Sequence, residues 1–161
     1  MSDMSWRRDQ ALLAAAAALT LVLGLLVYGS GRDPARAALL PAMPWLAGTI
    51  DFGTAGQWLP SLAHCMAFGL LTALALAPRR AWQLAGCAAW ATIDSLFELG
   101  QLPSLAAAWQ HAAGPGLISD YLVRGTFDPA DIVAAWAGAV AAMGIVYAVS
   151  HTERRHDRIK A

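Results

Sequence analysis

A-W-Q-L-A-G-C-A-A-W-A-T-I-D-S-L-F-E-L-G-Q-L, residues 81–102, is a mostly apolar stretch of 22 residues that nevertheless carries two carboxylates. A helix of this length spans roughly 30 Å, the thickness of the hydrocarbon core of a bilayer. Its polar residues Asp94, Glu98 and Gln101 are spaced i, i+4 and i+7, so they fall within a stripe of roughly 60° on one helix face. A carboxylate inside a membrane costs at least about 2.5 kcal/mol unless it finds a partner or water. This face is therefore expected to look into a helical bundle.

The composition of the chain is typical of a membrane protein. Its 161 residues suffice for one domain, and they are 58% hydrophobic and only 14% charged, against about 25% charged in a soluble domain. The net charge is +0, so no nucleic-acid partner is expected. The two cysteines, Cys65 and Cys87, lie in apolar stretches and are interpreted as core residues. No Cys or His spacing matches a metal motif, so neither a metal nor a cofactor is expected.

Four apolar stretches predict an all-α integral membrane bundle with about four transmembrane helices. The predicted bundle covers residues 11–149, between a polar tail at 1–10 and a charged tail at 150–161. Its spans are expected at about residues 11–28, 61–77, 81–102 and 131–149. The short break at Pro78-Arg79-Arg80 predicts an antiparallel hairpin between the second and third spans.

The first apolar stretch has a second interpretation, as a signal peptide. A signal h-region usually has about 7–15 residues, and this stretch is longer, which favours a retained transmembrane helix. However, Ala35-Arg36-Ala37 fits an A-x-A cleavage site. Both interpretations leave the orientation of the other three spans unchanged.

The two longer connections have different characters. Residues 29–60 contain Pro34, Pro41 and Pro44, so they do not form one long helix, and their apolar side chains suit the membrane–water interface. Residues 103–130 are more polar and predict a short helix around 104–112 and a Gly-Pro-Gly turn at 114–116.

The basic residues predict which way the bundle faces. With four spans, both tails and the turn at 78–80 share one side, which holds eight of the 11 basic residues. The other side holds three, Arg32, Arg36 and Arg124. Because cytoplasmic loops carry an excess of Lys and Arg, both termini are expected to be cytoplasmic.

The direction in which each span crosses gives the depth of its residues, and these depths predict a layer of polar side chains near the outer surface of the membrane. Asp94 is expected below this layer, near the midplane. Ionisable residues within spans are functional candidates by default. The layer is expected to contain His64, Glu98, Gln101, Arg124, Asp128 and Asp131.

Most of these residues also have a purely structural interpretation. Asp128-Pro129-Ala130-Asp131 is typical of a helix start, with Asp at the N-cap, Pro at N1 and an acid at N3. His64 and Asp94 fit hydrogen-bonded structural roles, and Gln101 fits a bond between helices. Arg124 fits a contact with lipid phosphate. Glu98 is the hardest to explain structurally, because it lies inside a span and is expected to cap nothing.

At this point the chain resembles the VanZ-like family, small integral membrane proteins named for a teicoplanin-resistance component. The resemblance covers roughly residues 58–149 and has three marks. One is His64 near the start of a span, with an aromatic residue four positions later at Phe68. The second is the E-x-x-Q signature from Glu98 to Gln101. The third is the R-G-T-F-D-P-A-D run at residues 124–131, followed by an apolar span.

Two positions depart from the family pattern. Where members often have Asp-Lys before the histidine, this chain has Pro60 and Ser61, and Ala135 replaces an asparagine common in the last span. The resemblance implies a multi-pass protein of the bacterial cytoplasmic membrane with a link to cell-envelope stress or glycopeptide resistance. It implies no settled reaction.

Three functions remain open from the sequence. The first is a non-catalytic envelope protein that binds a lipid, a lipid-linked molecule or a glycopeptide at the outer leaflet, with Arg124 on an anionic headgroup and the Glu98 face on a polar group. The second is an enzyme acting on an outer-leaflet lipid, with His64 or Glu98 as general base, Asp131 orienting the histidine or helping to hold a cation, and Arg124 on phosphate. The third is a small transporter, which would need to form a homo-oligomer and would need a polar path past Asp94.

Overall fold

The structure, a computed structural model, describes residues 3–31 and 49–160. Over these residues it is all-α, with no strand. Residues 32–48 lie outside the described part, together with the expected proline-rich connection and the Ala35-Arg36-Ala37 sequence. The helices are α1 (Asp3–Gly31), α2 (Ala55–Ala75), α3 (Arg80–Gly100), α4 (Pro103–Ala113), α5 (Leu117–Arg124) and α6 (Pro129–Lys160).

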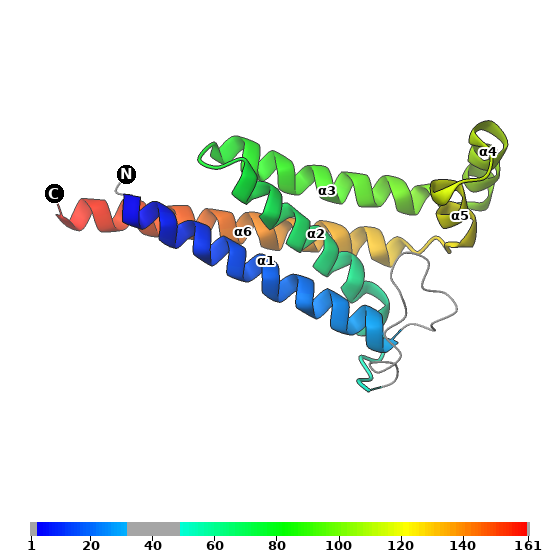
Figure 1. The fold of residues 1–161 in the computed structure, drawn as a ribbon, viewed down its shortest axis with the longest axis horizontal. Helices are drawn as coiled ribbons and strands as arrows, with labels where there is room; N and C mark the ends of the chain where they lie inside the picture. The colour runs from blue at the N-terminus through cyan, green and yellow to red at the C-terminus, as the bar shows by residue number, and fades with distance from the viewer. Residues whose placement is uncertain (1–2, 32–48, 161) are drawn as a thin grey trace.

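Two central helices, α2 and α6, pack against each other, and α1 and α3 flank them (Figure 1). Between the flanking helices α1 and α3 there is no contact in the described residues. The start of α1, the turn between α2 and α3, and the end of α6 lie toward one end of the bundle, while α4 and α5 cover the other end (Figure 1). This is the antiparallel order that the sequence predicts.

Small residues let the central helices approach closely. The sequence places the small residues Ala134, Gly138 and Ala142 four positions apart, a spacing that predicts close approach of another helix. In the structure all three are buried, and a Cβ added at Gly138 would collide with the backbone carbonyl of Leu62 on α2. Cys65 and Cys87 are free and fully buried, as the sequence predicts for core residues. Packing of this kind replaces the hydrophobic effect as the force that holds helices together in a membrane.

Three helices are long and apolar enough to cross a membrane. They contain the candidate spans Arg7–Ser30, Ala55–Ala75 and Pro129–Val149, with mean hydropathy of 2.4, 1.4 and 2.1. They match the predicted first, second and fourth spans. The predicted third span, α3, is not among them; it carries Arg80, Asp94 and Glu98 within 21 residues.

The first and last helices are longer than predicted, and the second begins earlier than predicted. The first helix begins at Asp3 and the last continues to Lys160, so the predicted tails continue the helices, because neither tail contains a helix-breaking Gly or Pro. The second helix begins at Ala55, six residues before the predicted start, and includes Pro60. This proline lies little more than one turn from the helix start, where a missing backbone N–H disturbs few hydrogen bonds.

Two short helices close the end opposite the termini. The helix predicted around residues 104–112 is present as α4, and Gly114 adopts φ +73° in the predicted Gly-Pro-Gly turn. The next helix, α5, was not predicted. It has only eight residues and buries Ser119 and Leu122, and Leu122 contacts the position of Gly100 at the end of α3.

The α2–α3 hairpin is held by a buried glutamine. Gln83 Nε2 donates to the backbone carbonyl of Ala73 at 2.9 Å. Ala73 lies in the last turn of α2, where backbone carbonyls lack an intrahelical partner. Close by, the Arg80 guanidinium lies 4.0 Å from the ring centroid of Tyr147, which joins α3 to α6.

Replacing Gln83 with alanine is expected to lower the free energy of unfolding by about 1–2 kcal/mol, because one buried hydrogen bond is lost and the Ala73 carbonyl stays desolvated. Thermal unfolding in detergent would measure this. Gln110→Ala, at an exposed position of α4, is the matched control and should leave the midpoint unchanged. Equal midpoints for the two variants would contradict the capping role of Gln83.

Candidate functional site

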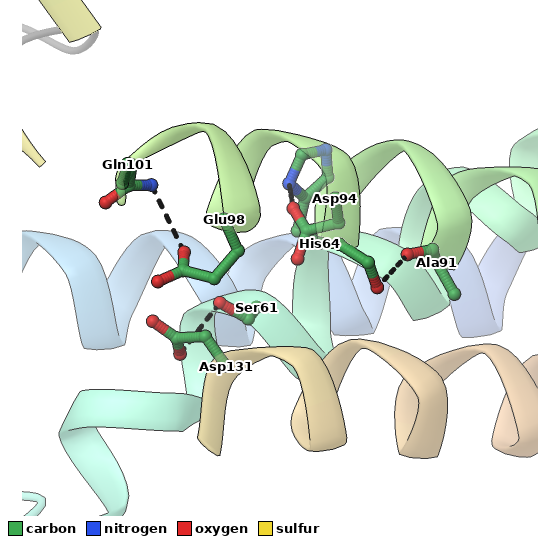
Figure 2. A network of polar contacts seen from close by, with 8 residues as sticks. Ser61, His64, Ala91, Asp94, Glu98, Gln101 and Asp131 are labelled. Carbon is green, nitrogen blue, oxygen red and sulfur yellow. Dashed lines mark hydrogen bonds and ion pairs between the residues drawn. The ribbon is translucent and has the colours of Figure 1, made fainter. Parts of the chain in front are cut away.

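The polar face of α3 is buried at its C-terminal end. Glu98 and Gln101 keep only 7% and 8% of their surface exposed. They lie one turn apart, and Gln101 Nε2 donates to Glu98 Oε2 at 3.1 Å (Figure 2). The inward orientation predicted from the helical spacing is confirmed.

Glu98 also binds the start of the last helix. Its Oε1 accepts the backbone N–H of Asp128 at 2.5 Å. The Asp128 side chain in turn accepts the backbone N–H of Ala130 at 2.9 Å, which is the predicted N-cap. The expectation that Glu98 caps nothing is therefore wrong, because its carboxylate holds the backbone from which α6 begins.

Asp131 joins α6 to α2. Ser61 Oγ donates to Asp131 Oδ1 at 3.0 Å. The Glu98 carboxylate points from α3 toward this pair (Figure 2). Thus Glu98, Gln101, Asp128 and Asp131, four of the predicted site residues, meet where α2, α3 and α6 converge. We call this set with Ser61 the polar junction.

His64 lies next to a different carboxylate from the one expected. Its Nδ1 is 3.6 Å from Asp94 Oδ1, and the two side chains are 44% and 20% exposed (Figure 2). The enzyme hypothesis placed His64 beside Glu98 or Asp131. In the structure Asp131 is bonded to Ser61 and Asp94 faces the histidine. Because α2 begins at Ala55, His64 lies nine residues, on the order of 14 Å, along the helix and not in its first turn.

Aromatic rings pack around the histidine. The His64 ring meets Phe68 edge to face at 4.7 Å and lies 5.9 Å from the Trp90 ring. Phe68 and Trp90 are themselves 4.9 Å apart. The indole N–H of Trp90 donates to Thr72 Oγ1 at 2.8 Å, which fixes this ring on the wall of the site.

His64 and the rings of Phe68 and Trp90 line a pocket of about 560 Å³. Helix α2 supplies residues of its floor, α1 and α3 its two sides, and α5 its outer end. Arg124, the predicted phosphate contact, is exposed and lines this pocket, as do His64 and Asp94. The other lining residues are mainly apolar or aromatic: Leu21, Gly24, Leu25, Tyr28, Pro60, Ser61, Ala63, Phe68, Trp90, Ile93, Phe97, Leu117, Ile118, Tyr121 and Gly125.

The predicted site residues therefore separate into two groups. The polar junction is hydrogen-bonded, and of its residues only Ser61 also lines the pocket, whereas His64 and Arg124 line the pocket with Asp94. Trp90, Phe97 and Tyr121 were not predicted as site residues, and Asp94 was placed below the polar layer. Asp94 could have been included from the sequence, because it lies four residues before Glu98 on the same helix face.

A metal centre has no support in the part of the chain that the structure describes. No three His, Cys, Asp or Glu side chains there are grouped so that they could hold an ion.

No protein-family model, curated protein or solved structure matches this chain. Its function is therefore inferred from the chemistry of the pocket.

Proposed function

We propose that this protein is a four-span integral membrane protein that binds a lipid in the pocket between α1 and α3. The observation that carries the proposal is the lining of that pocket, which combines aliphatic and aromatic side chains with three ionisable ones, His64, Asp94 and Arg124. A ligand that matches such a wall is apolar over most of its length and polar at one end. Ligand pockets usually measure about 300–1,000 Å³, and this one falls in that range.

The position of the pocket supports a ligand that enters from within the bilayer. Its two sides are formed by α1 and α3, which make no contact with each other over the residues described. A lipid can therefore reach the floor formed by α2 by sliding sideways between these helices. A water-soluble ligand would gain nothing from an entrance that faces hydrocarbon.

A four-span protein requires α3 to cross the membrane together with α1, α2 and α6. Its 21 residues reach about 32 Å, enough to cross the hydrocarbon core. Its two carboxylates face the bundle and have partners there. Its exposed side chains include Trp82, Ile93, Leu96, Phe97 and Leu99, which suit contact with lipid. A helix can cross with such charges when they are buried against other helices.

We further propose the bacterial cytoplasmic membrane as the location, with both termini cytoplasmic and the pocket in the outer leaflet. This rests on the excess of Lys and Arg expected on the side of the termini and on the sequence resemblance to the VanZ-like family. The E-x-x-Q and D-P-A-D marks of that resemblance now have a physical reason, since Glu98 accepts the Asp128 N–H. The mostly aliphatic and aromatic lining favours a lipid over a polar glycopeptide, so any link to glycopeptide resistance would act through envelope lipid.

One observation favours a membrane enzyme as the second candidate. Asp94 approaches Nδ1 of His64, which leaves Nε2 as the nitrogen that could exchange a proton. This is how an acidic residue orients a general-base histidine in many enzymes. Release of a product from the bound lipid over time would establish this candidate, whereas a lipid that is bound and recovered unchanged supports binding alone.

The lipid-binding proposal predicts that filling the pocket expels the ligand. Ile93 is half exposed and lines the pocket, so Ile93→Trp is expected to reduce the lipid retained by the purified protein at least about fivefold, with little change in stability. Native mass spectrometry measures the retained lipid. Val140→Trp, on an exposed part of α6 away from the pocket, is the control and should keep it. Equal retention in both variants would overturn the pocket as the binding site.

A further inference from the structure

The charges around the pocket are unevenly distributed. Asp94 presents its carboxylate from α3, and the carboxylates of Glu98 and Asp131 lie close enough behind it to act on it electrostatically. The lining residues of α1 include no charged side chain, α2 offers His64, and α5 offers Arg124. The inner part of the pocket is therefore acidic, and among the lining residues that the structure describes, the one permanently cationic side chain belongs to the short helix α5.

Aromatic rings surround the acidic part. Trp90 and Phe97 stand four residues before and three residues after Asp94, so all three side chains share one face of α3. Phe68 packs against Trp90 at 4.9 Å, and Tyr121 meets Phe97 at 5.9 Å. All four rings line the pocket. A carboxylate beside several aromatic faces is the setting in which proteins bind ammonium groups, through ion pairing and cation–π attraction.

Asp94 has the capacity to receive such a group. Its separation of 3.6 Å from His64 Nδ1 exceeds a hydrogen bond. A carboxylate has two oxygens and about four acceptor positions, so an ammonium can bind while the histidine stays in place. The side chain is 20% exposed, and it lines the pocket.

Arg124 supplies the opposite charge on the same pocket. It ends α5, it is exposed, and a guanidinium is the side chain best suited to a phosphate. The pocket thus offers one cationic and one anionic recognition point on an apolar wall. Arg124 ends α5, which covers the end of the bundle opposite the termini (Figure 1), and Asp94 lies on α3 six residues before that helix ends.

Resting on the lipid-binding function proposed above, we infer that the ligand is a zwitterionic phospholipid, with its ammonium group on Asp94 and the aromatic rings and its phosphate on Arg124. An anionic lipid would satisfy Arg124 but would place no cation against the carboxylates. A neutral lipid would bring no charged group to either Asp94 or Arg124. The charge pattern therefore selects for a headgroup that carries both signs.

The test is a headgroup comparison on delipidated wild-type protein. Phosphatidylethanolamine and phosphatidylglycerol with identical acyl chains are offered together, and native mass spectrometry gives the ratio bound. We expect phosphatidylethanolamine to be preferred about tenfold. Asp94→Asn should bring this ratio close to one, Arg124→Gln should weaken binding of both lipids, and Asp120→Asn, outside the pocket on α5, should change neither.

The outcomes separate the two proposals. If the wild type binds both lipids equally, or prefers phosphatidylglycerol, while Ile93→Trp still expels them, the pocket binds lipid and the zwitterionic selectivity is wrong. If Ile93→Trp has no effect on the binding of either lipid, the pocket is not the lipid-binding site. The wild-type ratio needs no variant, so a failure of Asp94→Asn to fold leaves the inference testable.

Discussion

Replacing Gly138 with alanine is expected to lower the free energy of unfolding by about 1–3 kcal/mol, the usual cost of overpacking a tight interior. Gly138 lies on α6 where this helix packs against α2, and the added Cβ would collide with the backbone carbonyl of Leu62. A backbone atom inside a helix cannot rotate away as a side chain can. The two central helices would have to separate, and every other contact along their interface would lengthen.

Gly144→Ala is the matched control for this change. It lies on the same helix, and an added Cβ meets no atom within 4 Å. Because alanine favours helix over glycine by up to about 1 kcal/mol, this variant should be as stable as the wild type or more stable. Thermal unfolding of the three proteins in one detergent compares them. A destabilisation of the same size in both variants would mean that helix geometry, and not the close approach of α2 to α6, explains the effect.

The sequence was sufficient for those features of the fold that depend on local pattern. Apolar length predicted the three helices that can cross a membrane, and the four-residue spacing of Ala134, Gly138 and Ala142 predicted a close-packed face. The Asp128-Pro129 start of α6 followed from capping chemistry and is present. In each case the preference arises within one helix or at its end, so neighbouring helices do not alter it.

The site could be predicted only in part, because its geometry depends on where helices begin in space. Helix α2 begins six residues, about 9 Å, before the predicted start, and His64 faces Asp94, which lies one turn before Glu98 on α3. The partner of Glu98 was also hidden, since it is the backbone N–H of Asp128, and every residue except proline has such a group. The rings around Asp94 gather from α2, α3 and α5, and α5 is too short for a periodic signal.

Replacing Glu98 with alanine is expected to lower the free energy of unfolding by about 3 kcal/mol. Two donors would lose their acceptor at once, the Asp128 N–H and the Gln101 amide, and both belong to the buried end of the bundle. Hydrogen bonds to a charged group are worth about 1.5–3 kcal/mol, and a buried donor left without a partner adds its desolvation cost. The start of α6 would then lose its attachment to α3.

Glu98→Gln should be milder, at about 1 kcal/mol, and the difference between the two variants tests the mechanism. A glutamine oxygen can still accept the Asp128 N–H, and the Gln101 amide can turn so that its oxygen faces the new NH₂ group. Leu99→Ala, at an exposed position on the same helix, is the control and should change stability by less than about 0.5 kcal/mol. Equal losses for alanine and glutamine would show that the charge of Glu98, rather than its hydrogen bonds, stabilises the junction.

The same variants decide whether Glu98 is structural or binds the ligand. Glu98 does not line the pocket, so Glu98→Gln should unfold at lower temperature and yet retain the bound lipid at the wild-type level. Ile93→Trp should do the reverse, because it fills the pocket and leaves the polar junction intact. Native mass spectrometry and thermal unfolding on both variants give the two readouts. A Glu98→Gln protein that keeps its stability but loses the lipid would restore the ligand-binding role that the sequence first suggested, and would place the binding site at the polar junction.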